Sequence, residues 1–87
     1  MSNELLKSSK VMGKVKYPFV IYPDSEGGYV AEIPALKGCL AQGETLSETL
    51  EELEIVENLW LETAQANGLE LPKVEFEIER VKERLAA

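Results

Sequence analysis

The first half of the chain carries short apolar segments separated by turn residues, a pattern typical of antiparallel strands. "KYPFVIYP" at 16–23 is rich in strand-forming residues, with apolar side chains on both faces, and predicts a covered strand. "PDSEGG" at 23–28 predicts a turn, because its two glycines permit positive φ. "GYVAEIP" at 28–34 predicts the returning strand, and "CLAQG" at 39–43 predicts a third, brief strand.

A helical pattern begins at Thr45. "TLSE" at 45–48 is a capping box, in which the Thr45 hydroxyl can accept from the N–H of Glu48 and the Glu48 carboxylate can reach back. Apolar residues then recur at spacings of three and four and mark one buried face: Leu46, Leu50, Leu53, Val56, Trp60 and Ala64. The pattern predicts a helix that ends at about Asn67 and Gly68, where glycine permits a left-handed stop.

The last segment, "KVEFEIERV" at 73–81, alternates between apolar and acidic residues. Its alternation predicts a half-buried antiparallel strand with an acidic outer face. Residues 1–12 are expected to form a flexible arm and residues 82–87 a tail. The prediction is therefore a single domain over residues 1–87 of the α+β class, with the order β-β-β-α-β and an antiparallel sheet packed by one long helix.

Charge narrows the possible partners. The 87 residues hold 16 acidic and 9 basic side chains and no histidine, which gives a net charge of −7. Such a protein repels phosphate backbones, so direct binding of nucleic acid is not expected, whereas a basic protein partner is favoured. The acidic residues concentrate between positions 44 and 62, a stretch without Lys or Arg: Glu44, Glu48, Glu51, Glu52, Glu54, Glu57 and Glu62.

The same sequence indicates a cytoplasmic protein. The N-terminal "MSNELLKSSK" lacks the apolar core of a signal peptide, and no apolar run approaches the roughly 20 residues that span a bilayer. Cys39 is the single cysteine, which agrees with a reducing compartment.

Candidate chemistry is sparse. Cys39 has no histidine to activate it and is predicted to be a packed core residue. Gly38 and Gly43 are predicted to shape turns, because no phosphate-loop motif is present and the helix that follows is acidic. Asp24 and Glu26 fall in the predicted hairpin turn. We therefore expect no catalytic residue, no metal site and no cofactor.

Two features of the helix do not fit a plain core element. Glu57 falls near the middle of the apolar stripe and is expected to snorkel past the sheet edge or to meet Arg80 or Lys82. Ile55 and Leu59 lie on the opposite, acidic side, where two apolar residues one turn apart predict an oligomer or partner contact. The candidate partner-binding residues are Glu48, Glu51, Glu52, Ile55, Leu59 and Glu62.

An ordered series of short motifs resembles the HicB-like antitoxin family. The series comprises the aromatic strand Tyr17 to Tyr22, the hairpin Asp24 to Tyr29, "IPALKGC" from Ile33 to Cys39, "GETLSE" from Gly43 to Glu48, and "WLE" from Trp60 to Glu62. The resemblance covers roughly residues 17–72 and implies a partial ribonuclease-H-like fold. It also implies binding and masking of a small basic mRNA-cleaving toxin of the HicA type. The chain departs from the family at Glu57, where an apolar residue is usual, and after Pro72, where too few residues follow for a DNA-binding domain.

The leading hypothesis is accordingly a non-enzymatic antitoxin-like protein that forms a homodimer or homotetramer. An alternative is a stand-alone homo-oligomeric binding domain whose partner or ligand is unrelated to a toxin. A third is a metal-dependent nuclease, which the lack of carboxylates converging on a shared pocket disfavours.

Overall fold

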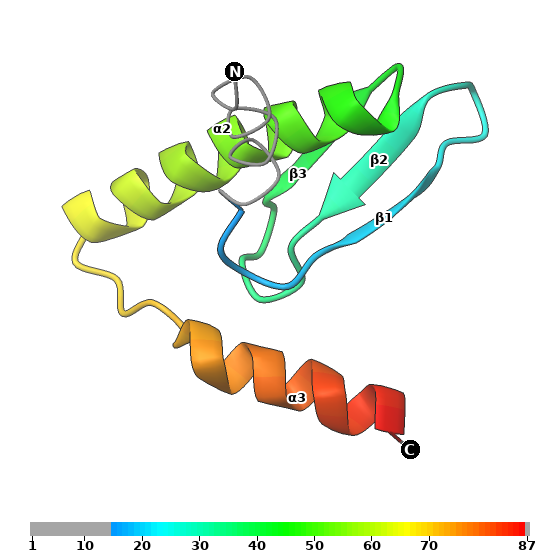
Figure 1. Ribbon diagram of the computed structural model, residues 1–87. Helices are drawn as coiled ribbons and strands as arrows, with labels where there is room; N and C mark the ends of the chain where they lie inside the picture. The colour runs from blue at the N-terminus through cyan, green and yellow to red at the C-terminus, as the bar shows by residue number, and fades with distance from the viewer. Residues whose placement is uncertain (1–14, 87) are drawn as a thin grey trace, which may run out of the picture.

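A three-stranded sheet and two helices form the part of the chain that the structure, a computed structural model, describes, residues 15–86 (Figure 1). The elements in chain order are β1 (Val20–Pro23), β2 (Tyr29–Glu32), β3 (Leu40–Gly43), α2 (Leu46–Ala66) and α3 (Val74–Ala86). The α+β class and the single long helix against a sheet are as predicted. The expected arm at 1–12 lies outside the described residues.

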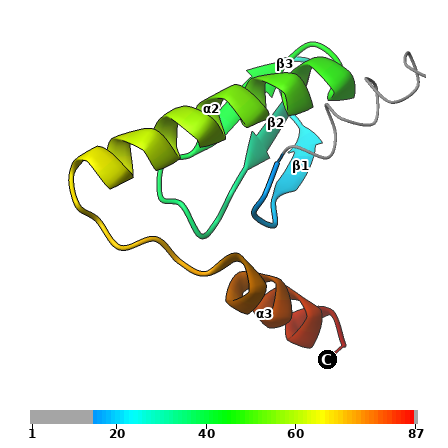
Figure 2. The same ribbon diagram turned by 60° about the vertical axis from the view of Figure 1, so that its left-hand side comes forward.

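The sheet is antiparallel throughout, in the order β1-β2-β3. Ala31 pairs with Ile21 on one side and with Ala41 on the other, so these three residues form one row across the sheet. All three pack in or against the core cluster, so their side chains point to the face that α2 covers. Figure 2 shows α2 lying along one face of the sheet. The neighbouring row, Val20, Glu32 and Leu40, therefore belongs to the opposite face, because successive side chains alternate in a strand.

The core lies between the sheet and α2. Ala31, Leu36 and Leu53 are fully buried there, and small residues at 31 and 41 let the helix approach the strands closely. The remaining members of the cluster are Tyr17, Ile33, Cys39 and Ala41. With so few buried large side chains, each contact within this thin core carries a large share of the stability.

Both ends of α2 match the capping predicted from sequence. The Glu48 N–H donates to the Thr45 hydroxyl at 3.1 Å, as a capping box requires. The Glu48 carboxylate accepts from the N–H of Glu44 at 3.1 Å, one residue before the expected donor. At the other end Gly68 has φ +71°, the left-handed conformation that closes a helix after its C-cap Asn67.

Two glycines allow the hairpin, β3 and α2 to approach one another. Gly28 has φ +75°, and a Cβ atom built on it would lie 2.5 Å from the backbone oxygen of Gly43. A Cβ atom on Gly43 would lie 2.7 Å from the backbone nitrogen of Thr49. Side chains at either position would therefore push the elements apart.

The first strand is shorter and more open than predicted. Regular pairing covers only Val20–Pro23 rather than 16–23. Val20 and Tyr22 are about half exposed, so the expectation of a strand covered on both faces is wrong. The reason is that α2 packs on one face of the sheet, and no other described helix or strand packs on the second face.

The predicted fourth strand is also wrong, because Val74–Ala86 forms helix α3. The element order is β-β-β-α-α, and residues 82–86, expected to be a tail, belong to this helix. The segment carries two periods at once: the alternation of 74–79 fits a strand, whereas Val74, Ile78, Val81 and Leu85 recur at helical spacing. No described strand pairs with this segment, so the helix, which satisfies its own backbone hydrogen bonds, is formed instead.

Candidate partner-binding surface

The six residues predicted for partner binding lie together on one side of α2. We call this surface the outer face of α2: Glu48, Glu51, Glu52, Ile55, Leu59 and Glu62. All six are exposed, and they lie opposite the buried Leu53 and Glu57 around the helix. The structure thus brings the sequence-predicted site residues onto one surface of one rigid element.

The chemistry of the outer face is an apolar centre within a negative rim. Ile55 is 53% exposed and Leu59 58% exposed, although each is a large aliphatic side chain. The four glutamates around them contribute four negative charges without a basic residue between Glu44 and Glu62. A protein that presents an apolar anchor ringed by Lys or Arg would complement this surface.

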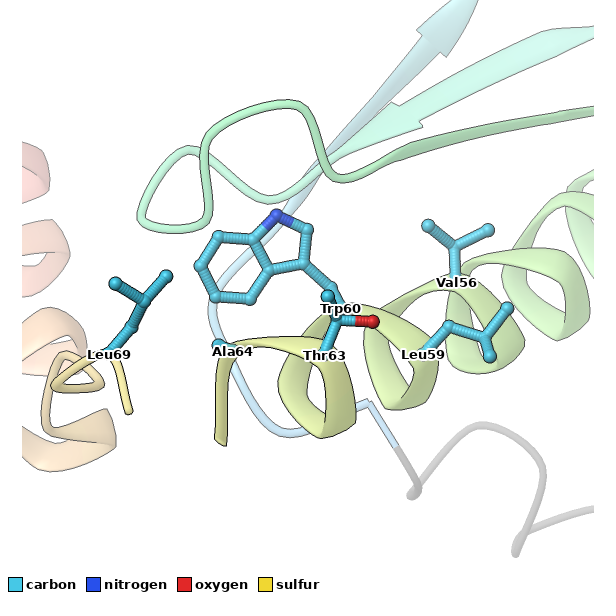
Figure 3. A pocket seen from close by; sticks show the side chains of 6 residues that line it. All are labelled: Val56, Leu59, Trp60, Thr63, Ala64 and Leu69. Atoms are coloured by element: carbon cyan, nitrogen blue, oxygen red, sulfur yellow. The ribbon is translucent and has the colours of Figure 1, made fainter. Parts of the chain in front are cut away.

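An apolar groove continues from Leu59 toward the end of α2. Its volume is about 410 Å³, and Figure 3 shows Trp60 and Leu69 on its two sides. The Trp60 indole N–H donates to the Lys37 carbonyl at 2.9 Å, which fixes the ring against the loop that precedes β3. The other lining residues are Val56, Leu59, Thr63 and Ala64. The groove extends the apolar surface that the pair Ile55 and Leu59 begins.

Glu57 is fully buried, and its partners differ from those expected. Both of its carboxylate oxygens accept from the Lys16 N–H, at 3.1 and 3.0 Å. The Tyr17 N–H donates to the same carboxylate at 3.0 Å. The predicted contacts with Arg80 or Lys82 are not formed: Arg80 pairs with Glu77 and Lys82 with Glu79, both one turn away on α3. Glu57 therefore ties the segment before β1 to the middle of α2.

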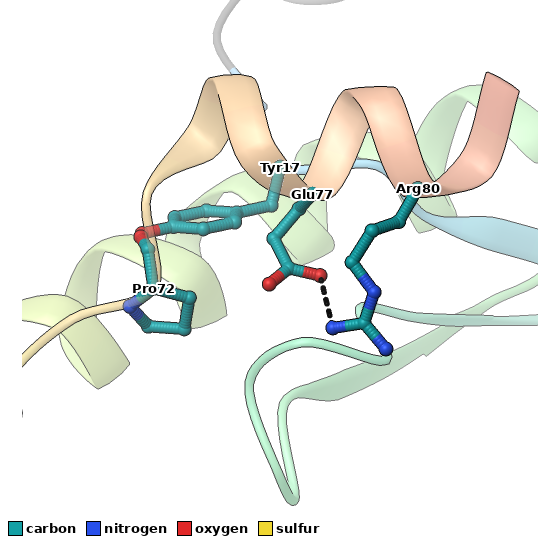
Figure 4. Close-up of polar contacts among 4 residues, drawn as sticks. All are labelled: Tyr17, Pro72, Glu77 and Arg80. Carbon is teal, nitrogen blue, oxygen red and sulfur yellow. Dashed lines mark hydrogen bonds and ion pairs between the residues drawn. The ribbon is translucent and has the colours of Figure 1, made fainter. Parts of the chain in front are cut away.

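Tyr17 links this anchor to the C-terminal part of the fold. Its hydroxyl donates to the Pro72 carbonyl, just before α3 begins, as Figure 4 shows beside the Glu77–Arg80 ion pair at 3.6 Å. Burial raises the pKa of the Tyr17 phenol, and the carboxylates of Glu57, Glu77 and Glu75 raise it further. This tyrosine is therefore held in its neutral, hydrogen-bond-donating form.

The residues considered above as candidates for catalysis or ligand binding have structural roles or lie in turns. Cys39 is 2% exposed, and burial, with a smaller contribution from Glu57, raises the pKa of its thiol. A raised pKa disfavours the thiolate, the form that reacts. Gly38 has φ +82°, as its predicted turn requires. In the β1–β2 hairpin the Asp24 N–H donates to the Gly28 carbonyl at 2.9 Å, and Glu26 is exposed.

Within residues 15–86, no three His, Cys, Asp or Glu side chains lie close enough together to hold a metal ion. The helices of that part of the chain include none that is long and apolar enough to cross a bilayer.

Sequence reasoning missed two features, one beside the outer face of α2 and one buried beneath the helix. The groove beside Trp60 depends on Leu69, which lies beyond the helix and carries no periodic signal. The backbone partners of Glu57 come from about 40 residues away in sequence, and backbone donors leave no mark in a sequence. The only sign in the sequence was the carboxylate within the apolar stripe, because a buried Glu needs hydrogen-bond donors around it.

Comparison with known proteins finds one family and several relatives that align with this chain over most of their own length. The family described as UPF0150-like matches residues 9–72. A UPF0150 protein of Synechocystis sp. is 66% identical over 73 residues, which are 84% of this chain and all of that protein. A UPF0150 protein of Thermoplasma acidophilum is 32% identical over 68% of this chain and 86% of that protein. The crystal structure of TTHA0281 from Thermus thermophilus has a TM-score of 0.58 at 23% identity, covering 84% of this chain and 88% of the other, a likeness of fold.

Proposed function

The chain belongs to the UPF0150-like family, and from this premise we propose that it is a cytoplasmic, non-enzymatic antitoxin-like protein. Its partner is a small basic mRNA-cleaving toxin of the HicA type, which it binds and masks. The resemblance to HicB-like antitoxins supports this proposal. The observation that carries it is the outer face of α2, where exposed Ile55 and Leu59 lie among four glutamates.

The chemistry of the two proteins explains why this face serves the function. A toxin that cleaves mRNA needs a positive surface to grip the phosphate backbone. An acidic rim is attracted to that surface and accelerates the encounter, while the apolar centre slows dissociation. The complex would hide the positive surface of the toxin from RNA.

The test measures association and dissociation rates with the basic HicA-type protein at low and high salt. Glu51→Lys combined with Glu52→Lys should slow association by about tenfold at low salt and flatten its salt dependence, since steering by exposed charge is screened. Ile55→Asp should instead speed dissociation, because it places a charge in the apolar centre.

The matched control is Glu79→Lys combined with Glu83→Lys on α3. It changes the net charge by the same amount at two exposed residues far from the outer face. If both double variants associate at the wild-type rate with the wild-type salt response, the outer face of α2 is only a solvated surface and the proposal fails.

The sheet favours one second candidate, a homo-oligomeric binding domain with an unrelated partner. Val20, Tyr22 and Leu40 are each about half exposed on the face away from α2. Large apolar residues grouped on one face mark a contact surface. This candidate is preferred if the chain self-associates but shows no affinity for a HicA-type protein.

A further inference from the structure

Helix α3 is held against its own chain at its beginning and borders a cleft along its second half. Val74 packs against the core cluster, and the Tyr17 hydroxyl donates to the Pro72 carbonyl just before the helix starts. Ile78 and Val81 line a hollow together with Tyr17. Beside these contacts, a cleft of about 510 Å³ separates α3 from the start of β1 and from the β2–β3 connection.

The walls of this cleft, which we call the α3 cleft, are mostly apolar. Val20 of β1, with Pro34 and Ala35 of the β2–β3 connection, forms one wall. Val81 and Leu85 contribute the apolar part of the other wall, and Leu85 is 81% exposed. Ligand sites in proteins measure roughly 300–1,000 Å³ and combine an apolar lining with a few polar groups. The α3 cleft therefore has the size and lining that suit a small molecule with an apolar part.

Both arginines of the chain lie at this cleft, whereas every other basic residue is a lysine. Arg80 and Arg84 are four residues apart, so they share one face of α3. Arg80 forms a long ion pair with Glu77 at 3.6 Å, as Figure 4 shows. Within the described residues Arg84 forms neither an ion pair nor a side-chain hydrogen bond. One guanidinium at the cleft is therefore available to bind an anion.

The charges at the α3 cleft favour one kind of anion. Glu77 contributes one negative charge and Arg80 and Arg84 two positive ones, a sum of +1 that a single carboxylate would neutralise. A phosphate group carries about −1.5 to −2 charges at pH 7 and would leave the cleft negative. None of the described lining residues is aromatic, so a nucleotide base would find no ring on which to stack. The planar guanidinium fork matches the two oxygens of a carboxylate.

We propose that the α3 cleft binds a small aliphatic monocarboxylic acid. The carboxylate pairs with Arg84 beside Arg80, and the hydrocarbon chain lies against Val20, Ala35 and Leu85. The chain as a whole has a net charge of −7 and repels anions, so binding depends on the local arginines. An acid of about ten heavy atoms in such a site should have a dissociation constant of roughly 0.1–1 mM. The cleft lies apart from the outer face of α2, so this site stands independently of the toxin proposal.

The probe is octanoate, titrated into the isotope-labelled full chain and followed by the backbone amide signals in NMR. We expect saturable shifts that cluster at Val20, Ala35 and Leu85. Acetate lacks the hydrocarbon chain and octanol lacks the charge, so each should bind at least about tenfold more weakly than octanoate. Octyl phosphate should also bind more weakly, because its additional charge is not neutralised. Tighter binding of octyl phosphate or of octanol than of octanoate would contradict the choice of a carboxylate.

Arg84→Gln and Lys82→Gln form a matched pair of variants. Each removes one positive charge from an exposed residue of α3, but Lys82 lines the neighbouring hollow with Tyr17 rather than the α3 cleft. Arg84→Gln should weaken octanoate binding by about tenfold, because it removes the charged partner of the carboxylate. Lys82→Gln should stay within about twofold of the wild type, because an exposed charge outside the site is screened.

Leu85→Ala tests the apolar wall separately. Leu85 is not a member of the core cluster, so the variant keeps the fold and should bind octanoate several-fold more weakly, because less of the hydrocarbon chain is covered. A wild-type chain that shows no saturable binding of octanoate at millimolar concentration overturns the proposal. So do equal losses of affinity in Arg84→Gln and Lys82→Gln, or shifts that cluster at the groove beside Trp60 instead of at the α3 cleft.

Discussion

At the scale of single residues, Glu57 shows how one carboxylate organises the entry to the sheet. The chain before β1 has no strand partner at residues 16 and 17, so its N–H groups need acceptors from elsewhere. Glu57 supplies both carboxylate oxygens from the centre of α2. The polar residue in the apolar stripe is thus a structural requirement, and no partner is needed to explain it.

We expect Glu57→Leu to destabilise the fold by about 3 kcal/mol or more, because it leaves the buried Tyr17 N–H and the part-buried Lys16 N–H without an acceptor. Glu57→Gln keeps one acceptor oxygen in the same place and should cost about 1–2 kcal/mol. Urea unfolding of the two variants beside the wild type checks the order. If Leu is tolerated as well as Gln, the hydrogen bonds to Lys16 and Tyr17 are dispensable.

At the scale of elements, the β1–β2 hairpin, β3 and α2 approach one another closely at two glycines. Gly28 approaches the Gly43 carbonyl, and Gly43 in turn approaches Thr49 of α2. The Thr49 hydroxyl donates to the Thr45 carbonyl at 2.7 Å and lies on the same side, so a Cβ atom on Gly43 would also come within 2.7 Å of this hydroxyl oxygen. Three elements therefore meet at two positions that lack a Cβ atom.

Gly28→Ala and Gly38→Ala form a matched pair that isolates this approach. The two positions have similar φ values, +75° and +82°, but a Cβ atom on Gly38 would meet nothing within 4 Å. Gly38→Ala should cost about 1 kcal/mol from backbone strain alone. Gly28→Ala should cost about 3 kcal/mol, because the added Cβ also pushes on the Gly43 carbonyl. If the two variants lose the same stability in thermal unfolding, the hairpin accommodates the Cβ atom on Gly28 without additional cost.

The elements also show which parts of the fold the sequence could predict. The hairpin, the third strand and α2 with both caps followed from turn residues, capping chemistry and one clear period. The segment at 74–86 did not, because Val74 and Ile78 fit both periods and Phe76, 64% exposed in the helix, added a false strand signal. Choosing between the two needs the knowledge that no strand is available to pair with it. The candidate surface on α2 followed from helical spacing, whereas its groove needed the path of the chain at Leu69.

At the scale of the whole molecule, alkaline pH should weaken the fold through two buried acids. The pKa of Cys39 is raised from 9.0 and that of Tyr17 from 10.0, in both cases mainly by burial. A group with a raised pKa in the folded state stabilises the fold fully below its unfolded pKa. That stabilisation is lost as the pH rises through the folded pKa. The contribution of these two groups to the free energy of unfolding should therefore be constant from about pH 7 to 8 and should fall above about pH 9.

The measurement is the urea midpoint of the wild type and of Cys39→Ala between about pH 7 and 11. The variant lacks the thiol, so its stability should decline later, where the Tyr17 phenol begins to ionise. If the urea midpoints of the two proteins fall in parallel with pH, the Cys39 thiol has the same pKa in the folded and the unfolded state.

The position of Trp60 has a consequence for how binding at the outer face of α2 can be observed. It is the single tryptophan of the chain, half-buried in the groove that adjoins Leu59, with its indole N–H on the Lys37 carbonyl. The emission of an indole depends on the polarity around its ring. A partner that covers the outer face of α2 and the groove changes that polarity. The molecule thus contains an optical reporter of binding at this surface without any added label.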